Sequence, residues 1–477
     1  MSESLQKQNS FAAENLSYLG GIVFALLCAM LVVSTVAFGA VDVWALGVNA
    51  FLAGLVIIFW TADAWLKKEF RFGTSSLQIP ILGLILIGSV QLLPLRSLTL
   101  TAALLSEPAA DALSFAPYTT RLAIIQLVIY FVFFAAAQTY VSNADRLRKL
   151  VTVIIGFSAV MAFYGILQQL ADMNTIYGLR PARQAVPFAS FVNRHHFAAF
   201  MEMTIGLTLG LLFGKKAIKN DKRIFLLIAV VIMGTALIFT NSRGAMISLL
   251  AVIGFIVTTS LRQKTPDETE SEAEAEAETG SRLRNNTVYV GGGLILLVIL
   301  FGSVLLLGGG ESLVRGVGLS NPNEVSNGRF HFWQIAWQIF SGNPLLGAGL
   351  DTFGTLYPHY DSWNGTLRIE QAHNDYLQIL ADAGILGFAC IAAFIYLLFK
   401  KSPPVMSKAS DYFGRAAATG ALAGCLGILV HSFFDFPLRT PSNAFFFLTL
   451  TVIATNLLSP QKISRKRRMR PAAPPIS

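Results

Sequence analysis

Apolar runs long enough to cross a lipid bilayer recur along the chain, and they constrain its fold more than any other feature. A transmembrane helix needs about 20 predominantly apolar residues, because the hydrocarbon core is about 30 Å thick. Runs of this kind centre on twelve segments: 18–38, 43–62, 77–94, 120–141, 149–170, 195–213, 223–240, 244–261, 288–308, 373–399, 412–434 and 441–458. The chain is 54% hydrophobic and 13% charged, with a mean hydropathy of +0.59, which is unlike a soluble domain. The sequence therefore predicts an all-α polytopic membrane protein with about 12 transmembrane helices.

Clusters of basic residues follow alternate apolar runs and predict the orientation of the chain. Cytoplasmic loops of membrane proteins are enriched in Lys and Arg. Such residues follow the second, fourth, sixth, tenth and twelfth runs: Lys67, Lys68 and Arg71; Arg146, Arg148 and Lys149; Lys215, Lys216, Lys219, Lys222 and Arg223; Lys400, Lys401 and Lys408; and the tail from Lys462 to Arg470. All of them lie on one side if there are twelve spans, so both termini are predicted to be cytoplasmic.

This orientation gives a predicted domain organisation. We expect a cytoplasmic N-terminus at 1–17, helices one to nine at 18–308 with an acidic cytoplasmic linker at 262–286, an outer loop domain at 309–372, helices ten to twelve at 373–458, and a basic cytoplasmic tail at 459–477. The formal net charge of +9 then follows from topology and contact with anionic lipid, so nucleic-acid binding is not needed to explain it. The acidic linker is expected to be solvated.

The predicted outer loops and helix ends contain arginine but no lysine. The arginines are Arg96, Arg121, Arg180, Arg183, Arg194, Arg243, Arg315, Arg329, Arg368 and Arg439. The planar guanidinium fork suits bidentate binding of phosphate, whereas lysine is a hydrated point charge. This composition favours a phosphate-bearing ligand on the outer side. The alternative is that the arginines extend to lipid headgroups.

Several of these residues begin predicted helices that enter the membrane from outside. They are Arg121, Arg194 with His195 and His196, Arg243, His373 and Arg439. A cation at a helix N-terminus opposes the helix dipole, which favours anions there. The pattern makes sense if an anion such as a diphosphate lies among these ends. Asn193 precedes Arg194, and Asn241 with Ser242 precedes Arg243; Asn and Ser are good N-caps.

The outer segment 309–372 contains a predicted interfacial helix that begins at Arg329. Its aromatic residues Phe330, Trp333, Trp337 and Phe340 share one face, as in helices that lie in the membrane interface. A purely structural anchor is the alternative. The following segment 342–349, rich in glycine, is expected to form a tight turn.

Other chemistries find less support in the sequence. Adjacent histidines such as His195 and His196 point apart on a helix, and no zinc-binding spacing is present, so no metal is expected. The chain has no Walker loop and no dinucleotide fingerprint, so no nucleotide cofactor is expected. Glu202 lies inside a span, where an ionisable group needs a partner; an arginine is the favoured partner, and a role as a base is the alternative.

Six sequence blocks resemble the O-antigen ligase and polymerase superfamily. His373-Asn374 is followed, after nine residues, by Gly384-Ile385-Leu386-Gly387, which is similar to the signature of that family. The other similar blocks occur in the same order: 193–197, 242–244, 328–333, 344–349 and 431–437. The resemblance covers roughly 190–440, and it implies a lipid-dependent glycosyltransferase of GT-C-like architecture. His195 stands where this family commonly has asparagine.

The resemblance implies a donor, an acceptor and roles for particular residues. The expected reaction transfers a glycan from undecaprenyl diphosphate to an acceptor hydroxyl at the periplasmic face of the bacterial inner membrane, with inversion and without a metal. By this match His373 is the base or acceptor-orienting group, and Arg243 and Arg329 hold the diphosphate. Further substrate-binding candidates are Arg194, Arg121, His195, Asn374 and Asp435, of which Asn374 and Asp435 are expected to orient the acceptor or fix an arginine.

The identity of the acceptor stays open at this stage. An O-antigen ligase of lipopolysaccharide biosynthesis uses lipid A-core, whereas an O-antigen or exopolysaccharide polymerase uses a second lipid-linked repeat unit. A protein O-oligosaccharyltransferase would use the same residues. A transporter for bicarbonate or another small solute is the alternative from a different class, but the chain shows no internal repeat and its polar residues gather at one face. The ligase is the favoured interpretation.

Overall fold

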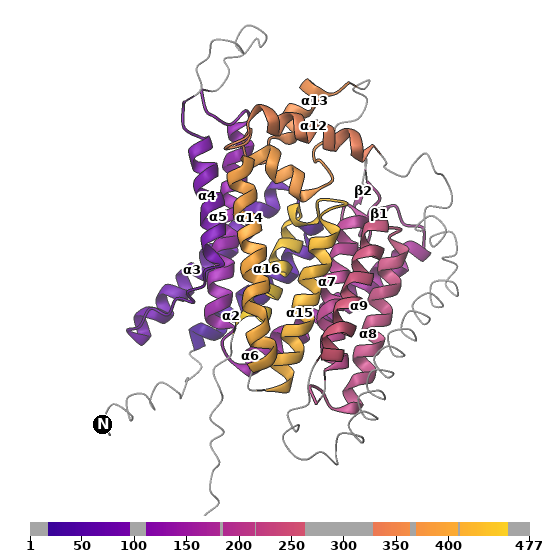
Figure 1. Cartoon of the computed structure of the whole chain (residues 1–477). Helices are drawn as coiled ribbons and strands as arrows, with labels where there is room; N and C mark the ends of the chain where they lie inside the picture. Colours follow the sequence, from indigo (N-terminus) through magenta and orange to yellow (C-terminus); the bar gives the residue numbers. More distant parts are fainter. Residues whose placement is uncertain are drawn as a thin grey trace, which may run out of the picture.

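The computed structural model describes residues 18–95, 111–181, 185–214, 216–262, 328–362, 369–408 and 411–456. In these ranges the chain is an all-α membrane protein, with long helices bundled side by side and a pair of short helices, α12 and α13, across one end (Figure 1). That end is called the α12 end below. The helices are α2 (Tyr18–Val36), α3 (Val43–Lys67), α4 (Gln78–Gln91), α5 (Pro117–Tyr140), α6 (Ala144–Leu170), α7 (Arg194–Phe213), α8 (Asn220–Phe239), α9 (Arg243–Arg262), α12 (Arg329–Gly342), α13 (Phe353–Tyr360), α14 (Asp375–Lys408), α15 (Tyr412–His431) and α16 (Pro441–Thr455).

Short elements connect these helices. The 3-10 helices are η1 (Phe38–Ala40) and η3 (Pro437–Arg439), and the two-residue strands β1 (Thr175–Ile176) and β2 (Arg180–Pro181) pair antiparallel. Arg180 in β2 forms an ion pair with Asp42, just before α3. This contact holds the β1–β2 turn against the start of α3.

Most of the predicted membrane spans correspond to helices of the structure. Within the described residues, nine helices are long and apolar enough to cross a membrane, and α4 and α16 are shorter apolar helices. Together they account for every predicted span except 288–308, which lies outside the described residues. The N-terminus at 1–17, the acidic linker after residue 262, the tail 459–477, and Arg96, Arg183, Arg315 and Arg368 also lie outside them.

Helices α7 and α15 pack at the centre of the bundle through facing glycines. A Cβ atom on Gly206 would lie 2.5 Å from the backbone nitrogen of Gly424, and one on Gly210 would lie 2.4 Å from the Cα of Gly420. Glycines four residues apart let two helix backbones approach closely, which is a common way for helices to associate in lipid. This contact fixes the two helices whose ends build much of the α12 end.

Helix α14 is interrupted at Gly384, where the backbone has φ 64° and ψ −163°. The break is hydrogen bonded to the segment after α12, because Ile385 N donates to Pro344 O at 2.9 Å and Gly349 N donates to Asp382 O at 3.0 Å. Gln91 at the end of α4 adds a side-chain bond to Asp382 O. The expected turn at 342–349 therefore exists, with positive φ at Gly347 and Gly349, and it binds the broken helix.

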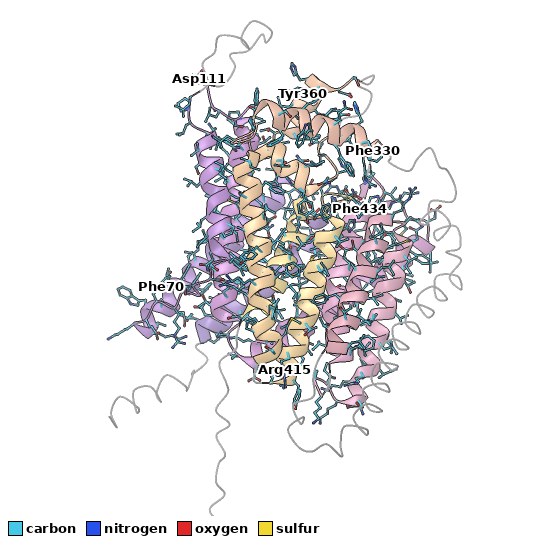
Figure 2. The ribbon with its side chains drawn as sticks, viewed as in Figure 1. Phe70, Asp111, Phe330, Tyr360, Arg415 and Phe434 are labelled. Carbon is cyan, nitrogen blue, oxygen red and sulfur yellow. The ribbon has the colours of Figure 1, made fainter. Side chains whose placement is uncertain are left out.

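The predicted aromatic face of α12 is exposed in part, because Trp333 and Phe340 are half-buried. Phe330 is 67% exposed and Trp337 is 56% exposed, while Phe332 and Ile339 on the other face are buried against α13 and α14. Figure 2 shows Phe330 at the α12 end, with Arg415 at the opposite end.

Candidate active site

Two chain segments joined by hydrogen bonds form the centre of the α12 end. They are 373–376, at the start of α14, and 429–436, at the end of α15. Asp375 N donates to Ser432 O at 2.9 Å, Asn374 Nδ2 donates to Phe433 O at 3.1 Å, and Tyr376 Oη donates to Leu429 O at 2.7 Å. These bonds place the start of one transmembrane helix against the end of the next, so side chains of both segments share a fixed frame.

Asn374 is a structural member of this frame. Its Oδ1 accepts hydrogen bonds from Tyr376 N at 3.0 Å and Leu377 N at 3.1 Å, and so caps α14. Because Asn374 provides the cap, the neighbouring His373 is left for other contacts. The backbone of His373 has φ 52°, a left-handed conformation that is uncommon for residues other than glycine and often marks functional sites.

His373, Asp435 and Arg329 meet in one cluster. His373 Nδ1 lies 3.0 Å from Asp435 Oδ1, and Arg329 Nη2 lies 3.6 Å from Asp435 Oδ2. The Asp435 side chain is only 1% exposed, whereas that of His373 is 27% exposed. The His373 ring is flanked by Phe332 and Phe436, and its backbone oxygen accepts a bond from Trp333 Nε1 at 3.4 Å. The structure thus brings together three predicted site residues that come from three separate parts of the chain.

The electrostatics of Asp435 determine how His373 is oriented. Burial alone would raise the pKa of the Asp435 carboxyl, but the charges and hydrogen bond of His373, together with His195 and His196, bring that pKa well below 3.8. The carboxyl is therefore ionised at neutral pH and can only accept hydrogen bonds. Nδ1 of His373 must be the donor, so Nε2 of a neutral His373 carries the free lone pair.

The starts of α7 and α9 border the same frame, and both predicted caps are confirmed. Asn193 Oδ1 accepts from His195 N at 2.9 Å, and Ser242 Oγ accepts from Ala245 N at 3.4 Å. Arg194 and Arg243 are accordingly the first residues of their helices, and both are partly buried. A Cβ on Gly244 would lie 3.1 Å from the ring of His431, so the start of α9 lies against the segment that carries Asp435.

The side chain of Arg243 makes no hydrogen bond or ion pair with any residue that the structure describes, which leaves its guanidinium group available. His195 lies next to Arg194, and its Nδ1 is buried without a partner among the described residues. Arg121, by contrast, is exposed at the start of α5 and shares no contact with the His373 cluster in the described part of the chain. The structure therefore separates Arg121 from the other candidates.

The structure changes what the sequence led us to expect of two charged residues, Glu202 and Arg439. Glu202 pairs with His431, whose Nδ1 lies 3.2 Å from both carboxyl oxygens, so the expected arginine partner was wrong. Both side chains are almost completely buried. Arg439 forms ion pairs with Asp351 and Asp382. Its guanidinium group is therefore already occupied, unlike that of Arg243. No sequence signal indicates these carboxylate partners, because they come from distant segments that only the tertiary fold brings together.

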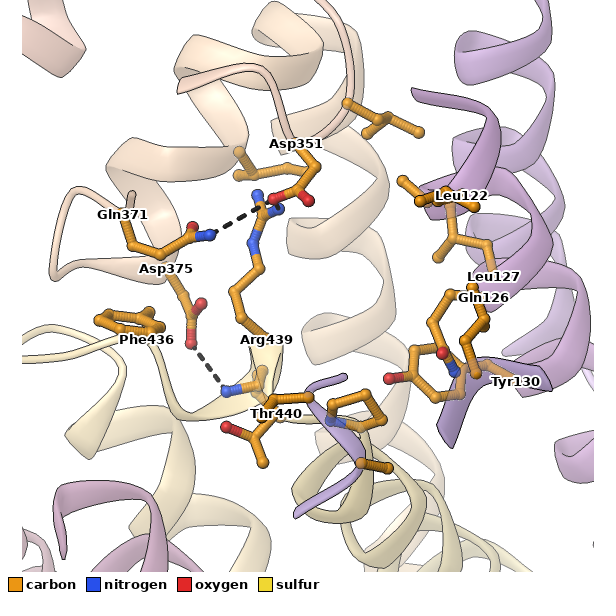
Figure 3. A pocket seen from close by; sticks show the side chains of 18 of the residues that line it. Leu122, Gln126, Leu127, Tyr130, Asp351, Gln371, Asp375, Phe436, Arg439 and Thr440 are labelled. Atoms are coloured by element: carbon orange, nitrogen blue, oxygen red, sulfur yellow. Dashed lines mark hydrogen bonds and ion pairs between the residues drawn. The ribbon is translucent and has the colours of Figure 1, made fainter. Parts of the chain in front are cut away.

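A cavity of about 560 Å³ lies beside the cluster (Figure 3). Its walls include residues of α3, α4, α5, α14 and η3, with single residues from η1, α7, α15 and α16. Most of them are apolar; Leu46, Leu84, Leu122 and Ile391 are examples. Polar side chains of 370–375 and Arg439 line one part of it. Phe436 closes the side nearest the cluster, because its ring lies 4.8 Å from that of His373 and 4.7 Å from that of His196.

One comparison with known proteins finds a family for this part of the chain. Residues 228–392 match the family model described as O-antigen ligase. The match begins within α8 and ends within α14, so it includes Arg243, Arg329 and His373 and leaves Asp435 outside. No curated protein matches the chain significantly.

Proposed function

From the match of residues 228–392 to the O-antigen ligase family model, we propose that the chain belongs to the O-antigen ligase and polymerase superfamily and is a glycosyltransferase of the ligase type. In this proposal it transfers a glycan from undecaprenyl diphosphate to a hydroxyl group of lipid A-core. It does so at the periplasmic face of the bacterial inner membrane, with both termini in the cytoplasm. The observation that carries the proposal is the contact of His373 with the ionised, buried Asp435 beside Arg329.

The proposed reaction is a single displacement. The acceptor oxygen forms a bond to the anomeric carbon of the donor sugar, and the bond from that carbon to the diphosphate oxygen breaks. The hydroxyl proton goes to Nε2 of His373, and the diphosphate leaves with the bonding electron pair. One displacement inverts the anomeric configuration.

Each group of the cluster has a defined part in this step. Asp435 holds the Nδ1–H tautomer of His373 and stabilises the imidazolium ion that forms, as a buried carboxylate does for a catalytic histidine. Arg243 supplies an available guanidinium group for the leaving diphosphate, and Arg329 supplies a second one at the start of α12. Fixed positive charge where negative charge develops is a large contribution to catalysis. In this proposal Arg194 at the start of α7 and the adjacent His195 also help to bind the diphosphate.

The proposal is tested with purified protein in detergent and a glycan linked to undecaprenyl diphosphate. Lipid A-core, or a second lipid-linked unit, is offered as acceptor to the wild type and to His373→Ala. Transfer to lipid A-core that disappears in the variant supports the ligase. Growth of the glycan on the lipid carrier would replace the ligase with a polymerase, and no donor consumption with either acceptor would overturn the proposal.

Arginine variants test the diphosphate site separately. Removing one charge-stabilising donor lowers kcat by a factor of about 10²–10³. We therefore expect Arg243→Ala and Arg329→Ala each to lower kcat by a factor in that range. Arg415→Ala, at the far end of the bundle (Figure 2), is the matched control and should keep wild-type activity. Near-normal turnover of both site variants would contradict the assignment of the two arginines.

A further inference from the structure

The cavity beside the His373 cluster has a lining that does not suit a second diphosphate. Asp351, Glu370 and Asp375 place carboxylates on its polar side. Arg439 is the one guanidinium or ammonium group among the described residues that line it, and it is already bound to Asp351 and Asp382. An entering phosphate would meet carboxylates with no available cation, and the like-charge repulsion would disfavour it.

The same cavity has polar atoms that lack partners. Gln126 Nε2, Gln371 Oε1 and His196 Nε2 are buried, belong to lining residues, and make no hydrogen bond within the described part of the chain. His196 is only 6% exposed, and its other ring nitrogen already bonds Thr440 Oγ1 at 2.6 Å. Buried polar groups are almost always hydrogen bonded, so unpaired ones in a cavity wall indicate a ligand or ordered water.

The two glutamines lie on opposite walls of the cavity. Figure 3 shows Gln126 and Tyr130 on α5, opposite Gln371, Asp375 and Arg439. The wall therefore offers an amide donor, an amide acceptor and a carboxylate within one space. A neutral molecule with several hydroxyl groups can both donate and accept there, because each hydroxyl has both capacities.

We infer that this cavity is the acceptor site of the enzyme and takes the uncharged, hydroxyl-bearing sugar end of a glycolipid acceptor. The inference rests on the proposed function and divides the two substrates between two places. The diphosphate donor lies on the side of Arg243 and Arg329, and the acceptor sugar lies on the side of Gln126 and Gln371. The cavity ends at Phe436, whose ring touches that of His373, so the acceptor hydroxyl approaches the base from this side.

Size and polarity agree with this occupant. A volume of about 560 Å³ is within the range of pockets for small-molecule ligands. Sugar rings have apolar faces, and the leucines of α3, α4 and α5 provide apolar walls against which such a face can lie.

The test compares Gln126→Leu and Gln371→Leu with Gln169→Leu, a matched change at an exposed position on α6. Initial rates are measured against lipid A-core at saturating donor, and against the undecaprenyl-diphosphate-linked glycan at saturating acceptor. Loss of one neutral hydrogen bond weakens binding about three- to tenfold. Each cavity variant should therefore raise KM for lipid A-core by that factor and leave KM for the donor unchanged, and Gln169→Leu should change neither.

Acceptor binding measured without turnover provides a second test of the inference. Native mass spectrometry of His373→Ala with lipid A-core should show one bound acceptor, which the added pair Gln126→Leu and Gln371→Leu removes. Unchanged acceptor KM and retained lipid A-core in the cavity variants would overturn the inference while the loss of transfer in His373→Ala still supported the proposed function. A rise in donor KM would instead assign the cavity to the donor and overturn the inference.

Discussion

The carboxylate of Asp435 connects the chemistry of the site to its architecture. It contacts His373, lies 3.6 Å from Arg329, and accepts a hydrogen bond from Phe436 N at 3.0 Å. A single side chain therefore orients His373, the proposed base, contacts Arg329, which is proposed to bind the diphosphate, and fixes the segment that closes the cavity.

Asp435→Asn should lower kcat while the protein stays folded. The amide keeps the size of the side chain but can donate to Nδ1 of His373, which would place the proton on Nε2 and remove the base. A general base contributes about 10²–10⁴ in rate, and we expect a loss in that range in the transfer assay. Asp172→Asn, a matched change at an exposed position, should retain full activity; equal rates for the two variants would show that Asp435 does not act on His373.

The depressed pKa of Asp435 predicts a pH dependence of stability. Its folded-state pKa lies below the ordinary 3.8, so ionised Asp435 stabilises the folded protein above about pH 4, and this contribution is lost as pH falls through the folded-state pKa. The difference in Tm between wild type and Asp435→Asn in detergent should therefore shrink as the pH is lowered from about 5 to about 3. A difference that grows over this interval would contradict the sign of the shift.

At the scale of single elements, the break in α14 depends on glycine. The backbone at Gly384 has a conformation that is essentially restricted to glycine, and a Cβ there would lie 2.4 Å from Leu345 O. The segment after α12 is bonded directly to this break. Strain at Gly384 would therefore displace the segment after α12 as well as α14 itself.

Gly384→Ala is expected to lower Tm in detergent by several degrees, because it combines backbone strain with a steric clash. Gly156→Ala provides the control: a Cβ added to this helical glycine would have no neighbouring atom within 4 Å, and alanine has the higher helix propensity. Its Tm should be unchanged or higher. If both variants melt like the wild type, the backbone at Gly384 is not restricted as described.

At the scale of the whole molecule, the orientation in the membrane is a proposal that labelling can test. Gln338 on α12 and Ser407 near the end of α14 are both exposed and lie at opposite ends of the bundle (Figure 1). In a variant whose native cysteines are replaced, Gln338→Cys should react with a membrane-impermeant maleimide in spheroplasts. Ser407→Cys should react only after lysis, and the reverse pattern would invert the proposed topology.

The sequence predicted much of the fold because hydropathy acts locally. Each apolar run specifies a helix through its own length and composition, and eleven of the twelve predicted spans coincide with described helices. The break at Gly384 could not be predicted in the same way, since it depends on hydrogen bonds with Pro344 and Leu345 on another segment. The glycine contacts between α7 and α15 likewise depend on which helices become neighbours.

The candidate site was predictable in its residues and only partly in its contacts. Resemblance pointed to His373, Arg243, Arg329 and Asp435, and the structure places three of them in contact. The resemblance did not reveal that His431 pairs with Glu202, or that Arg439 pairs with Asp351 and Asp382, because the partners in each pair lie far apart in the sequence. Nor did it indicate the cavity, whose walls come from segments spread between residues 40 and 441.

The contact between His373 and Asp435 also has a consequence for biosynthesis. The two residues are separated by 62 positions, with both α14 and α15 between them. During synthesis the histidine is completed first and stays without its carboxylate until both of these helices have been made and packed. Under the proposed mechanism, a chain that stalls in the membrane before that point has its arginines but no oriented base, so incomplete protein is expected to be inactive towards a lipid-linked sugar.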